Sequence, residues 1–432
     1  MNTRIMNTRG HQSLLVIGSL LVIIGALLMS LPALCQDEGF IYGKISTEDG
    51  KFYEGPIRWG KEEIYWNDMF NSSKERNENL RYLSDRDKER LDDKHYTWSS
   101  WENHFTNFIG SKHWSGSNDD NDYIHQFSCQ FGEIKTLRPM GKKYVELELQ
   151  NGQKFEVSGE GYNDIGLDIR VMDKELGEVE IYWGRIDKIE FMTTPAKLEL
   201  KFGQPLYGTV EAFGDKFTGY IQWDHDERIS TDKLDGDSDD GDVSIEFSKI
   251  RSIERKGGQS LVILKSGREL WLDGSNDVSS GHRGVIVMNK EFPSIDIPWR
   301  EFDKVVFEDK TPGPAAVYKD FSTQKELNGK VTTHDGKTIA GKIIFDLDET
   351  HDYELLQGKE GEFVYATAFR NVKKITTKGE HRCMIELRSG KKITLDEGQD
   401  VNEKNQGVLV FVSDKEKPSY IPWGEVNEIE FK

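Results

Sequence analysis

The stretch that decides the fold is residues 208–223, GTVEAFGDKFTGYIQW, because related stretches occur twice more in the chain. Residues 43–59 are GKISTEDGKFYEGPIRW, and residues 329–345 are GKVTTHDGKTIAGKIIF. In each stretch, apolar and polar residues alternate on both sides of a glycine-containing turn. This is the pattern of a β-hairpin with one buried face. Three such hairpins predict an all-β protein built from internal repeats.

A second pattern follows each hairpin and ends at a closing tryptophan. It begins with an alternating strand, passes an Asn-Asp or Gln-Asp pair, and ends with Trp183, Trp299 or Trp423, each followed eight residues later by Phe. We therefore expect three tandem repeat modules, with each closing tryptophan buried at a corresponding place. The expected modules are residues 36–192, 204–307 and 326–432.

Each module also contains one shorter motif twice, an aromatic residue followed by apolar residues three and six positions later. The six copies begin at Phe131, Trp183, Phe247, Trp299, Phe369 and Trp423. The period of three indicates a single tight turn that leads into a strand. Each module is therefore predicted to hold two similar halves of four or five short strands.

This layout of a bent hairpin, a third strand, a short turn and a closing strand resembles small SH3-like or Sm-like β-barrels. The resemblance implies a fold and no activity, because such barrels host many functions. The whole pattern also resembles tandem repeats of uncharacterised secreted bacterial proteins. A six-bladed β-propeller remains open as the alternative, because a blade also has four strands in about 50 residues.

Residues 1–35 are predicted to be a signal peptide. Two arginines precede the apolar stretch 14–31, and Ala33-Leu34-Cys35 suits cleavage before Gln36. Cleavage would place the mature chain in the periplasm, on the outer surface or outside the cell, with no integral membrane domain. Retention of residues 14–31 as an anchor and lipidation of Cys35 remain open.

The composition excludes several classes of protein. With 36% hydrophobic and 11% aromatic residues, the 432-residue chain has enough apolar side chains for buried cores. Its net charge of −19 argues against nucleic acid as a partner, since nucleic-acid binding requires a basic surface. After signal cleavage only Cys129 and Cys383 remain. We expect both to be buried small side chains rather than a disulfide or a metal pair.

The first module carries an insert at about residues 72–125 that the other two modules lack. Ser72-Ser-Lys-Glu75 matches a capping box, and residues 74–91 are rich in helix formers, so a helix is predicted there. An aromatic stretch follows. Its candidate ligand-binding residues are Trp98, Trp101, Trp114 and Glu102, because binding residues concentrate on loops that a rigid scaffold presents. The other interpretation packs the helix and the aromatic residues on their own module.

Acidic residues recur at two corresponding positions in each module. They are Glu63, Glu227 and Glu349 at the first position, and Asp68, Asp232 and Glu354 at the second. Because a catalytic pair is seldom needed three times, we expect these acids to have structural or solvated roles.

The second module adds an Asp-rich stretch at residues 235–242, in which Asp235, Asp237 and Asp239 are weak candidates for calcium ligands. The required glycine comes one residue late, at Gly241, so we favour a hairpin tip over a calcium loop. No other metal site and no cofactor are predicted.

The chain contains no nucleophile elbow, phosphate-binding loop, zinc-binding His-Glu-x-x-His or CxxC pair. We therefore expect an exported, non-enzymatic scaffold or binding protein of the cell envelope or exterior, with a protein or a polysaccharide as partner. The alternative is a carbohydrate-active enzyme with its site at the insert, where Glu102 or Asp119 would supply the acid. Neither the partner nor the oligomeric state follows from the sequence.

Overall fold

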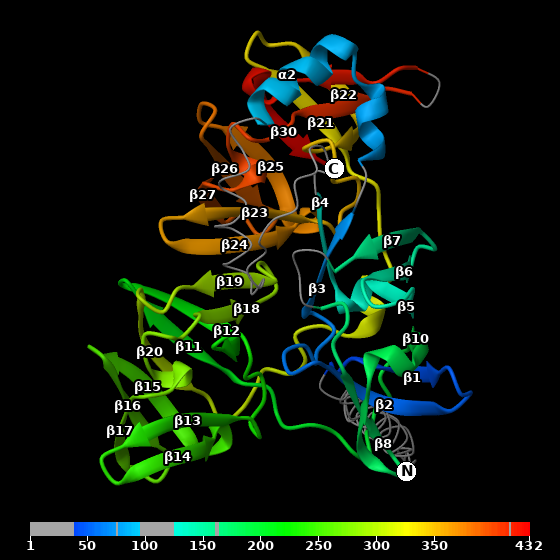
Figure 1. Cartoon of the computed structure of the whole chain (residues 1–432). Coiled ribbons are helices and arrows are strands. Elements are labelled where there is room, and N and C mark those ends of the chain that lie inside the picture. The colour runs from blue at the N-terminus through cyan, green and yellow to red at the C-terminus, as the bar shows by residue number, and fades with distance from the viewer. Residues whose placement is uncertain (1–38, 75–76, 96–124, 160–163, 414–415) are drawn as a thin grey trace, which may run out of the picture.

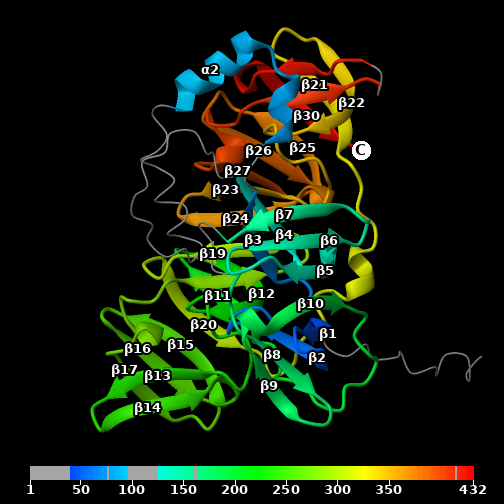
Figure 2. The same ribbon diagram turned by 45° about the vertical axis from the view of Figure 1, so that its right-hand side comes forward.

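The computed structural model describes residues 39–74, 77–95, 125–159, 164–413 and 416–432. Nearly all of its regular structure is antiparallel β-strand, which confirms the predicted all-β class. The thirty strands of the described residues fall into three segments of ten in chain order. The first segment is β1–β10, the second is β11–β20 and the third is β21–β30. Figures 1 and 2 show the three segments as separate groups of strands around a common centre.

The bounds of the elements are as follows. The first segment has β1 (Tyr42–Thr47), β2 (Phe52–Trp59), β3 (Met69–Lys74), β4 (His125–Gln130), β5 (Ile134–Pro139), β6 (Tyr144–Leu149), β7 (Lys154–Ser158), β8 (Ile169–Asp173), β9 (Gly177–Ile181) and β10 (Ile186–Phe191). The second has β11 (Tyr207–Ala212), β12 (Asp215–Trp223), β13 (Lys233–Ser238), β14 (Gly241–Glu246), β15 (Ile250–Lys256), β16 (Gln259–Leu264), β17 (Glu269–Leu272), β18 (Val285–Met288), β19 (Ser294–Ile297) and β20 (Phe302–Phe307). The third has β21 (Asn328–Thr333), β22 (Thr338–Ile344), β23 (Leu355–Glu360), β24 (Phe363–Ala368), β25 (Val372–Thr377), β26 (Arg382–Leu387), β27 (Lys392–Asp396), β28 (Val408–Phe411), β29 (Ser419–Ile421) and β30 (Val426–Phe431). The α-helix is α2 (Asp85–His95), and the 3₁₀ helices are Glu78–Tyr82, Phe131–Glu133, Trp183–Arg185, Phe247–Lys249, Asn276–Val278, Tyr318–Phe321, Phe369–Asn371, Gln399–Val401 and Trp423–Glu425.

The strands of the first segment pair in the order β4-β3-β7-β6-β5-β10-β1-β2-β8-β9. Corresponding strands of the third segment pair in the same order. The second segment follows it too, except that the β13–β14 hairpin meets its neighbour through a single bridge between Asp237 and Asp273. Among the described strands, no sheet closes into a ring of paired strands, so these sheets are open.

The pairing corrects the expectation that each half is a continuous stretch of sequence. The first hairpin, β1–β2, pairs with β10 and β8 at the end of its segment, while β6–β7 pairs with β5 and β3. Relative to the predicted halves the hairpins are exchanged: the consecutive strands β3–β7 form one five-strand group, and β1, β2, β8, β9 and β10 form the other. The two groups are joined where β5 pairs with β10. The alternation of apolar residues shows which face of a strand is buried, but it does not select the neighbouring strand.

The six aromatic motifs form the predicted turns. In five of them the aromatic residue begins a three-residue 3₁₀ helix, and the next residue, the first of a strand, donates its N–H to the aromatic carbonyl. The sixth, Trp299, lies in a turn before β20. The closing tryptophans Trp183, Trp299 and Trp423 are 4%, 8% and 2% exposed, as predicted. Each packs edge-on against the aromatic residue at the end of its segment's second strand, with ring centroids 5.8–5.9 Å apart.

The segments are joined by packed elements rather than by loose linkers. β19 pairs with β24, so one sheet runs from the second segment into the third. The proline-rich joint before the third segment, residues 311–324, packs against the first segment. Phe321 is buried there against Gly132, where any Cβ atom would overlap its ring, and Tyr318 packs on Trp66 with ring centroids 4.4 Å apart.

The insert lies between β3 and β4, which pair with each other. Ser72 belongs to β3, so the predicted capping box is wrong. Helix α2 follows Ser84 instead, whose Oγ accepts the Asp87 N–H at 3.2 Å. The helix lies on the third segment rather than on its own module (Figures 1 and 2). Leu83 and Leu91 are buried there in one apolar cluster with Ile344, Leu347 and Leu409.

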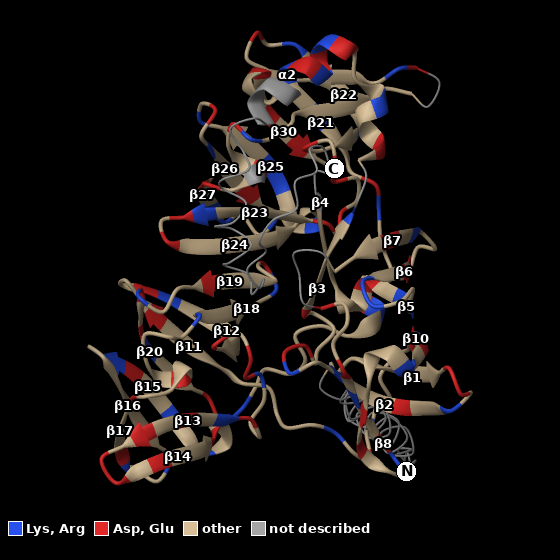
Figure 3. Cartoon of the chain, in the orientation of Figure 1, with Lys and Arg blue, Asp and Glu red and all other residues tan. Residues whose placement is uncertain are grey.

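None of the helices in the described ranges is long and apolar enough to cross a membrane. Lys and Arg are interspersed with Asp and Glu over all three segments (Figure 3). Cys129 and Cys383 are free and buried, as expected.

Candidate functional site

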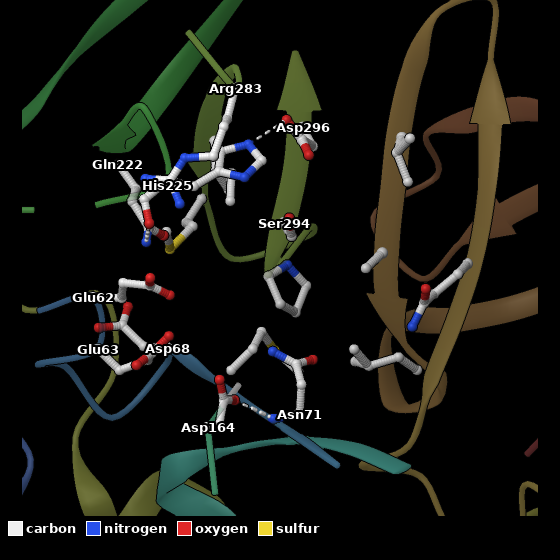
Figure 4. A pocket seen from close by; sticks show the side chains of 18 of the residues that line it. Glu62, Glu63, Asp68, Asn71, Asp164, Gln222, His225, Arg283, Ser294 and Asp296 are labelled. Carbon is white, nitrogen blue, oxygen red and sulfur yellow. Dashed lines mark hydrogen bonds and ion pairs between the residues drawn. The ribbon is translucent and has the colours of Figure 1, made fainter. Parts of the chain in front are cut away.

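A cleft of about 100 Å³ lies where the three segments meet. Figure 4 shows Glu62, Glu63 and Asp68 of the first segment on one side, with Gln222, His225 and Arg283 of the second segment beyond them. The third segment contributes residues of β23 and β24 to the lining.

A tight turn after β2 presents the two glutamates. The Trp59 N–H donates to the Glu63 carbonyl at 2.8 Å, and the Glu62 and Glu63 N–H groups both donate back to the Trp59 carbonyl. Gly60 supplies the positive φ of 57° that the turn requires. The corresponding turns after β12 and β22 carry the same hydrogen bonds at Trp223–Glu227 and Phe345–Glu349.

The turn after β12 is built without glycine. Asp224 and His225 have positive φ values of 47° and 60°, a conformation that costs about 1–3 kcal/mol when a side chain must adopt it. The His225 imidazole, which is buried, is held by Asp296 at 3.1 Å. Arg283 forms ion pairs with Asp226 at 2.7 Å and Asp224 at 3.7 Å, and these ion pairs hold the two aspartate side chains of the turn in place.

The recurring glutamates, at residues 63, 227 and 349, form buried carboxyl pairs. The second member of each pair is the aspartate of the Asn-Asp or Gln-Asp sequence in the same segment, at residue 164, 277 or 400. Burial and the Asp164 carboxylate hold the pKa of Glu63 well above its usual range, and burial raises the pKa of Asp164 to about 7. In the second segment, burial and Asp277 raise the pKa of Glu227 to about 9, and burial raises that of Asp277 to about 6. Each pair therefore retains a proton near neutral pH.

The third segment repeats this arrangement with Glu349 and Asp400. The pKa of Glu349 is held well above its usual range by burial and by Asp400, and burial raises the pKa of Asp400 to about 7. Each aspartate also accepts a backbone N–H, at 2.7 Å or less: Asp164 from Asn71, Asp277 from Asp235, and Asp400 from Gln357. Three such arrangements support the expected structural role for these acids.

Glu62 adds a further acid to the cleft, next to Glu63 in the turn after β2. Glu62 lines the cleft, and the Arg283 side chain, which binds Asp226 of the second segment at 2.7 Å, lines it too. Burial, followed by the charges of Asp164 and Asp226, raises the pKa of Glu62 to about 8, although Arg283 opposes the shift. At neutral pH Glu62 is therefore protonated in an acidic corner of the cleft.

The second set of recurring acids, at residues 68, 232 and 354, ties each turn to another segment. One oxygen of each acid accepts two successive backbone N–H groups of its own turn. Each acid also forms an ion pair with a basic side chain of a different segment. Asp68 binds Arg228 at 2.9 Å, Asp232 binds Arg58 at 2.7 Å, and Glu354 binds Lys74 at 3.2 Å.

The sequence-predicted site residues lie apart from this cleft or outside the described ranges. Trp98, Trp101, Trp114, Glu102 and Asp119 belong to residues 96–124, which lie outside those ranges. They remain predictions.

The Asp235–Asp242 stretch forms the β13–β14 hairpin, in which Asp237 pairs with Asp242 and Ser238 with Gly241. Asp235 and Asp237 lie on a strand, and Asp239 lies in the turn. Within the described ranges, no group of three or more His, Cys, Asp or Glu residues is arranged to hold a metal ion.

Sequence reasoning singled out Glu63 and Asp68 only as recurring acids with a structural or solvated role, and it missed Glu62, Asp226 and Arg283. One signal was available for two of them: an acid directly precedes the recurring glutamate in every module, at residues 62, 226 and 348. Arg283 has no such signal, because it lies far along the chain from the acids that it contacts.

Comparison with protein-family models, with curated proteins and with solved structures gave no match to this chain.

Proposed function

We propose that this chain is an exported, non-enzymatic scaffold of three tandem repeats that binds a protein or a polysaccharide in the cell envelope or outside the cell. The repeat assignment is supported by the shared pairing order of the three segments. On the same proposal, each five-strand group is an open relative of the small SH3-like or Sm-like barrels. Export is supported by the predicted signal peptide at residues 1–35.

The observation that carries the binding role is the cleft at the junction of the three segments, because buried ion pairs form it before any ligand arrives. Arg228 and Asp68 are 0% and 3% exposed at the boundary of the first two segments. Lys74 of the first segment lies between Asp348 and Glu354 of the third, at 3.4 and 3.2 Å. Such a preformed site loses little conformational entropy when a partner binds.

Expression of the full chain in a secreting bacterial host tests export. We expect the mature protein in the periplasm or the medium, with Gln36 as its first residue. A full-length product in the membrane fraction would show that residues 14–31 are retained as an anchor, and a lipid on Cys35 would show lipidation. A chain that stays in the cytoplasm would contradict the proposal.

One observation favours the carbohydrate-active alternative, now at the cleft. Glu62 is a carboxyl group that remains protonated at neutral pH, as a general acid must. The cleft volume of about 100 Å³ argues against it, because pockets that enclose drug-sized ligands measure about 300–1,000 Å³.

Incubation of the mature protein with a panel of polysaccharides separates the two functions. Retention of the protein on a polysaccharide without release of sugar supports the scaffold. Release of reducing sugar would establish the enzyme. Loss of that release in Glu102→Gln or in Glu62→Gln would then place the acid in the insert or in the cleft.

A further inference from the structure

We propose that the outer edge of β9 binds an extended segment of a partner polypeptide that carries Lys or Arg at alternate positions, and that this segment joins the sheet as an antiparallel strand. β9 is the last strand in the pairing order of the first segment, and no described strand pairs with its other side. In Figure 2 the β8–β9 hairpin lies at the lower end of that segment. The inference goes beyond the cleft, because it assigns a second surface and the kind of partner that fits it.

The counterpart of β9 in the second segment shows that this edge of the fold accepts a further strand. β19 pairs on one side with β18, as β9 pairs with β8, and on the other side it pairs antiparallel with β24 of the third segment. The residues of β19 that pair with β24, 294 to 296, lie three to five positions before the closing Trp299. The same positions before Trp183 are Glu178 to Glu180 of β9.

The backbone groups of Glu178 and Glu180 point to the free edge. The Gly60 N–H donates to the Asp168 carbonyl at 3.2 Å, so Asp168 and every second residue after it face β2. The residues between them face β9, where Val179 is opposite one of them, at position 171. Val179 therefore faces β8, and its neighbours Glu178 and Glu180 direct their N–H and C=O groups away from the sheet. Such a row of donors and acceptors is a template for a further strand.

The side chains of β9 select the charge of the partner strand. Glu178 and Glu180 are 49% and 48% exposed, and Arg170 of β8 contacts both of them, at 3.7 and 3.3 Å. One guanidinium cannot neutralise two carboxylates, so negative charge remains beside the free edge. Opposite charges on facing residues of two paired strands stabilise the pairing, and like charges destabilise it. The edge therefore favours a strand with basic residues opposite the two glutamates.

The end of β9 lacks a protecting residue that its two counterparts have. In the second and third segments a proline, Pro298 or Pro422, directly follows the strand, whereas Tyr182 stands at this position in the first segment. Proline has no N–H to donate and is one of the residues that protect the edges of sheets.

Tyr182 also supplies apolar surface beside the edge. It continues the extended backbone of β9, with φ −65° and ψ 134°, and its side chain is 63% exposed. Leu176 is 66% exposed at the other end of the strand. A partner strand that pairs with β9 can cover both side chains, which adds apolar burial to the backbone hydrogen bonds.

A second copy of this chain fits the edge less well than a basic segment does. Its own β9 would place Glu178 and Glu180 against the same two acids, and the whole chain has a net charge of −19. The outer side of β14 is also unpaired among the described strands, but β14 carries Asp242 and Glu246 and would bring further acids. The charges therefore favour a different, basic polypeptide.

Fluorescence anisotropy with labelled peptides tests the proposal on the mature protein in about 0.15 M salt, which screens diffuse attraction to an acidic protein. The probe is a short peptide with blocked ends in which lysine alternates with valine. One control has glutamate in place of lysine, and another has the same composition with its lysines grouped together. We expect saturable binding of the alternating peptide alone. Methylation of its lysine backbone nitrogens, which removes the donors that face β9, should abolish binding, whereas methylation of its valine nitrogens should not.

Variants then locate the site. Glu180→Pro removes an outward N–H and leaves the pairing with β8 in place, so it should weaken peptide binding by about tenfold or more. Ser244→Pro is the matched control on the free edge of β14. Ser238 and Gly241 flank the two-residue turn of that hairpin and exchange hydrogen bonds, so Ser244 points outward, and its replacement should leave binding unchanged. The methylated peptides use the unaltered protein and decide the question if Glu180→Pro folds poorly.

Three results would overturn the proposal. The first is no saturation up to about 1 mM peptide. The second is equal binding of the grouped-lysine or glutamate peptide, and the third is indifference to methylation of the lysine nitrogens. A dimer of the mature protein that Glu180→Pro dissociates would assign the edge to a second copy of the chain and would also overturn it.

The two proposals fail separately. Absence of peptide binding leaves retention on a polysaccharide or a protein possible at another surface. Release of sugar from a polysaccharide would end the non-enzymatic scaffold without affecting the peptide titration.

Discussion

Replacement of Arg228 by Met is expected to loosen the boundary between the first and second segments. The Arg228 side chain is 0% exposed, and its guanidinium donates to Asp68 Oδ1 at 2.9 Å and to the Ile221 carbonyl at 3.1 Å. Met has a similar length but cannot donate either hydrogen bond. The substitution therefore leaves the Asp68 carboxylate, 3% exposed, without its cation.

The magnitude follows from what remains around Asp68. Its Oδ2 atom retains the Ile64 and Tyr65 N–H groups at 2.7 and 2.8 Å, whereas Oδ1 loses the Arg228 hydrogen bond. Removal of one partner of a buried ion pair costs about 3–5 kcal/mol. Because the two backbone hydrogen bonds persist, we expect the lower part of that range, about 3 kcal/mol.

A double-mutant cycle in urea, followed by tryptophan fluorescence, measures the effect. Arg228→Met with Asp68→Asn should cost about 1–3 kcal/mol less than the sum of the single variants, because the second change removes the unpaired charge. Arg170→Met is the control, since the Arg170 pairs with Glu178 and Glu180 are partly exposed and should cost at most about 1 kcal/mol. A loss below about 1 kcal/mol for Arg228→Met, or strict additivity in the cycle, would refute the reasoning.

Three further predictions concern stability and one concerns metal binding. Trp423→Ala should lower the free energy of unfolding by about 3–5 kcal/mol, as for other buried large aromatic residues. A decrease below about 1 kcal/mol in urea denaturation would show that the packing of this side chain is dispensable. Folded Glu227 keeps its proton up to about pH 9, whereas the unfolded chain loses it near its ordinary pKa of 4.5, so stability should fall as pH rises between these values. Glu227→Gln should flatten that fall in melting temperatures recorded from pH 5 to 10, and an unchanged slope would contradict it. Deletion of 75–124, which spares the paired ends of β3 and β4, should leave a cooperative but less stable fold, because it exposes the third-segment surface beneath α2. Failure of that chain to fold would show that the insert belongs to the core. Calorimetry in about 0.15 M salt should detect no calcium site of micromolar affinity, and such a site, lost on changing Asp237 and Asp239 to Asn, would contradict the hairpin interpretation.

The local structure of this chain could be predicted closely from its sequence. The spacing of the aromatic residues predicts six tight turns, and the alternation around Gly214 and its counterparts predicts the hairpins. These features depend on a few neighbouring residues, whose preferences the sequence records directly. The exchange of hairpins within a segment depends on a choice between similar partners far apart in the chain, and no residue of β2 distinguishes β8 from β3.

The cleft was predicted only in part for the same reason. Glu63 and Asp164 each belong to a recurring motif and were therefore visible in the sequence. Their proximity to Asp226 and Arg283 arises only when two segments meet. The helix prediction at Ser72 failed because pairing of β3 with β4 outweighs a local capping pattern.

The pairing of the first and tenth strands also limits the order in which the protein can fold as the chain is synthesised. Trp59 of β2 pairs with Ile169 of β8, and Gly43 of β1 pairs with Phe191 of β10, so the first hairpin has no permanent strand partner until about 110 residues have followed it. The hairpins that pair with neighbours in sequence can form earlier, but completion of each segment must wait for its last strand. High contact order of this kind slows folding and leaves unpaired strand edges exposed meanwhile. We therefore expect the first segment to be the part of the chain that depends most on chaperones.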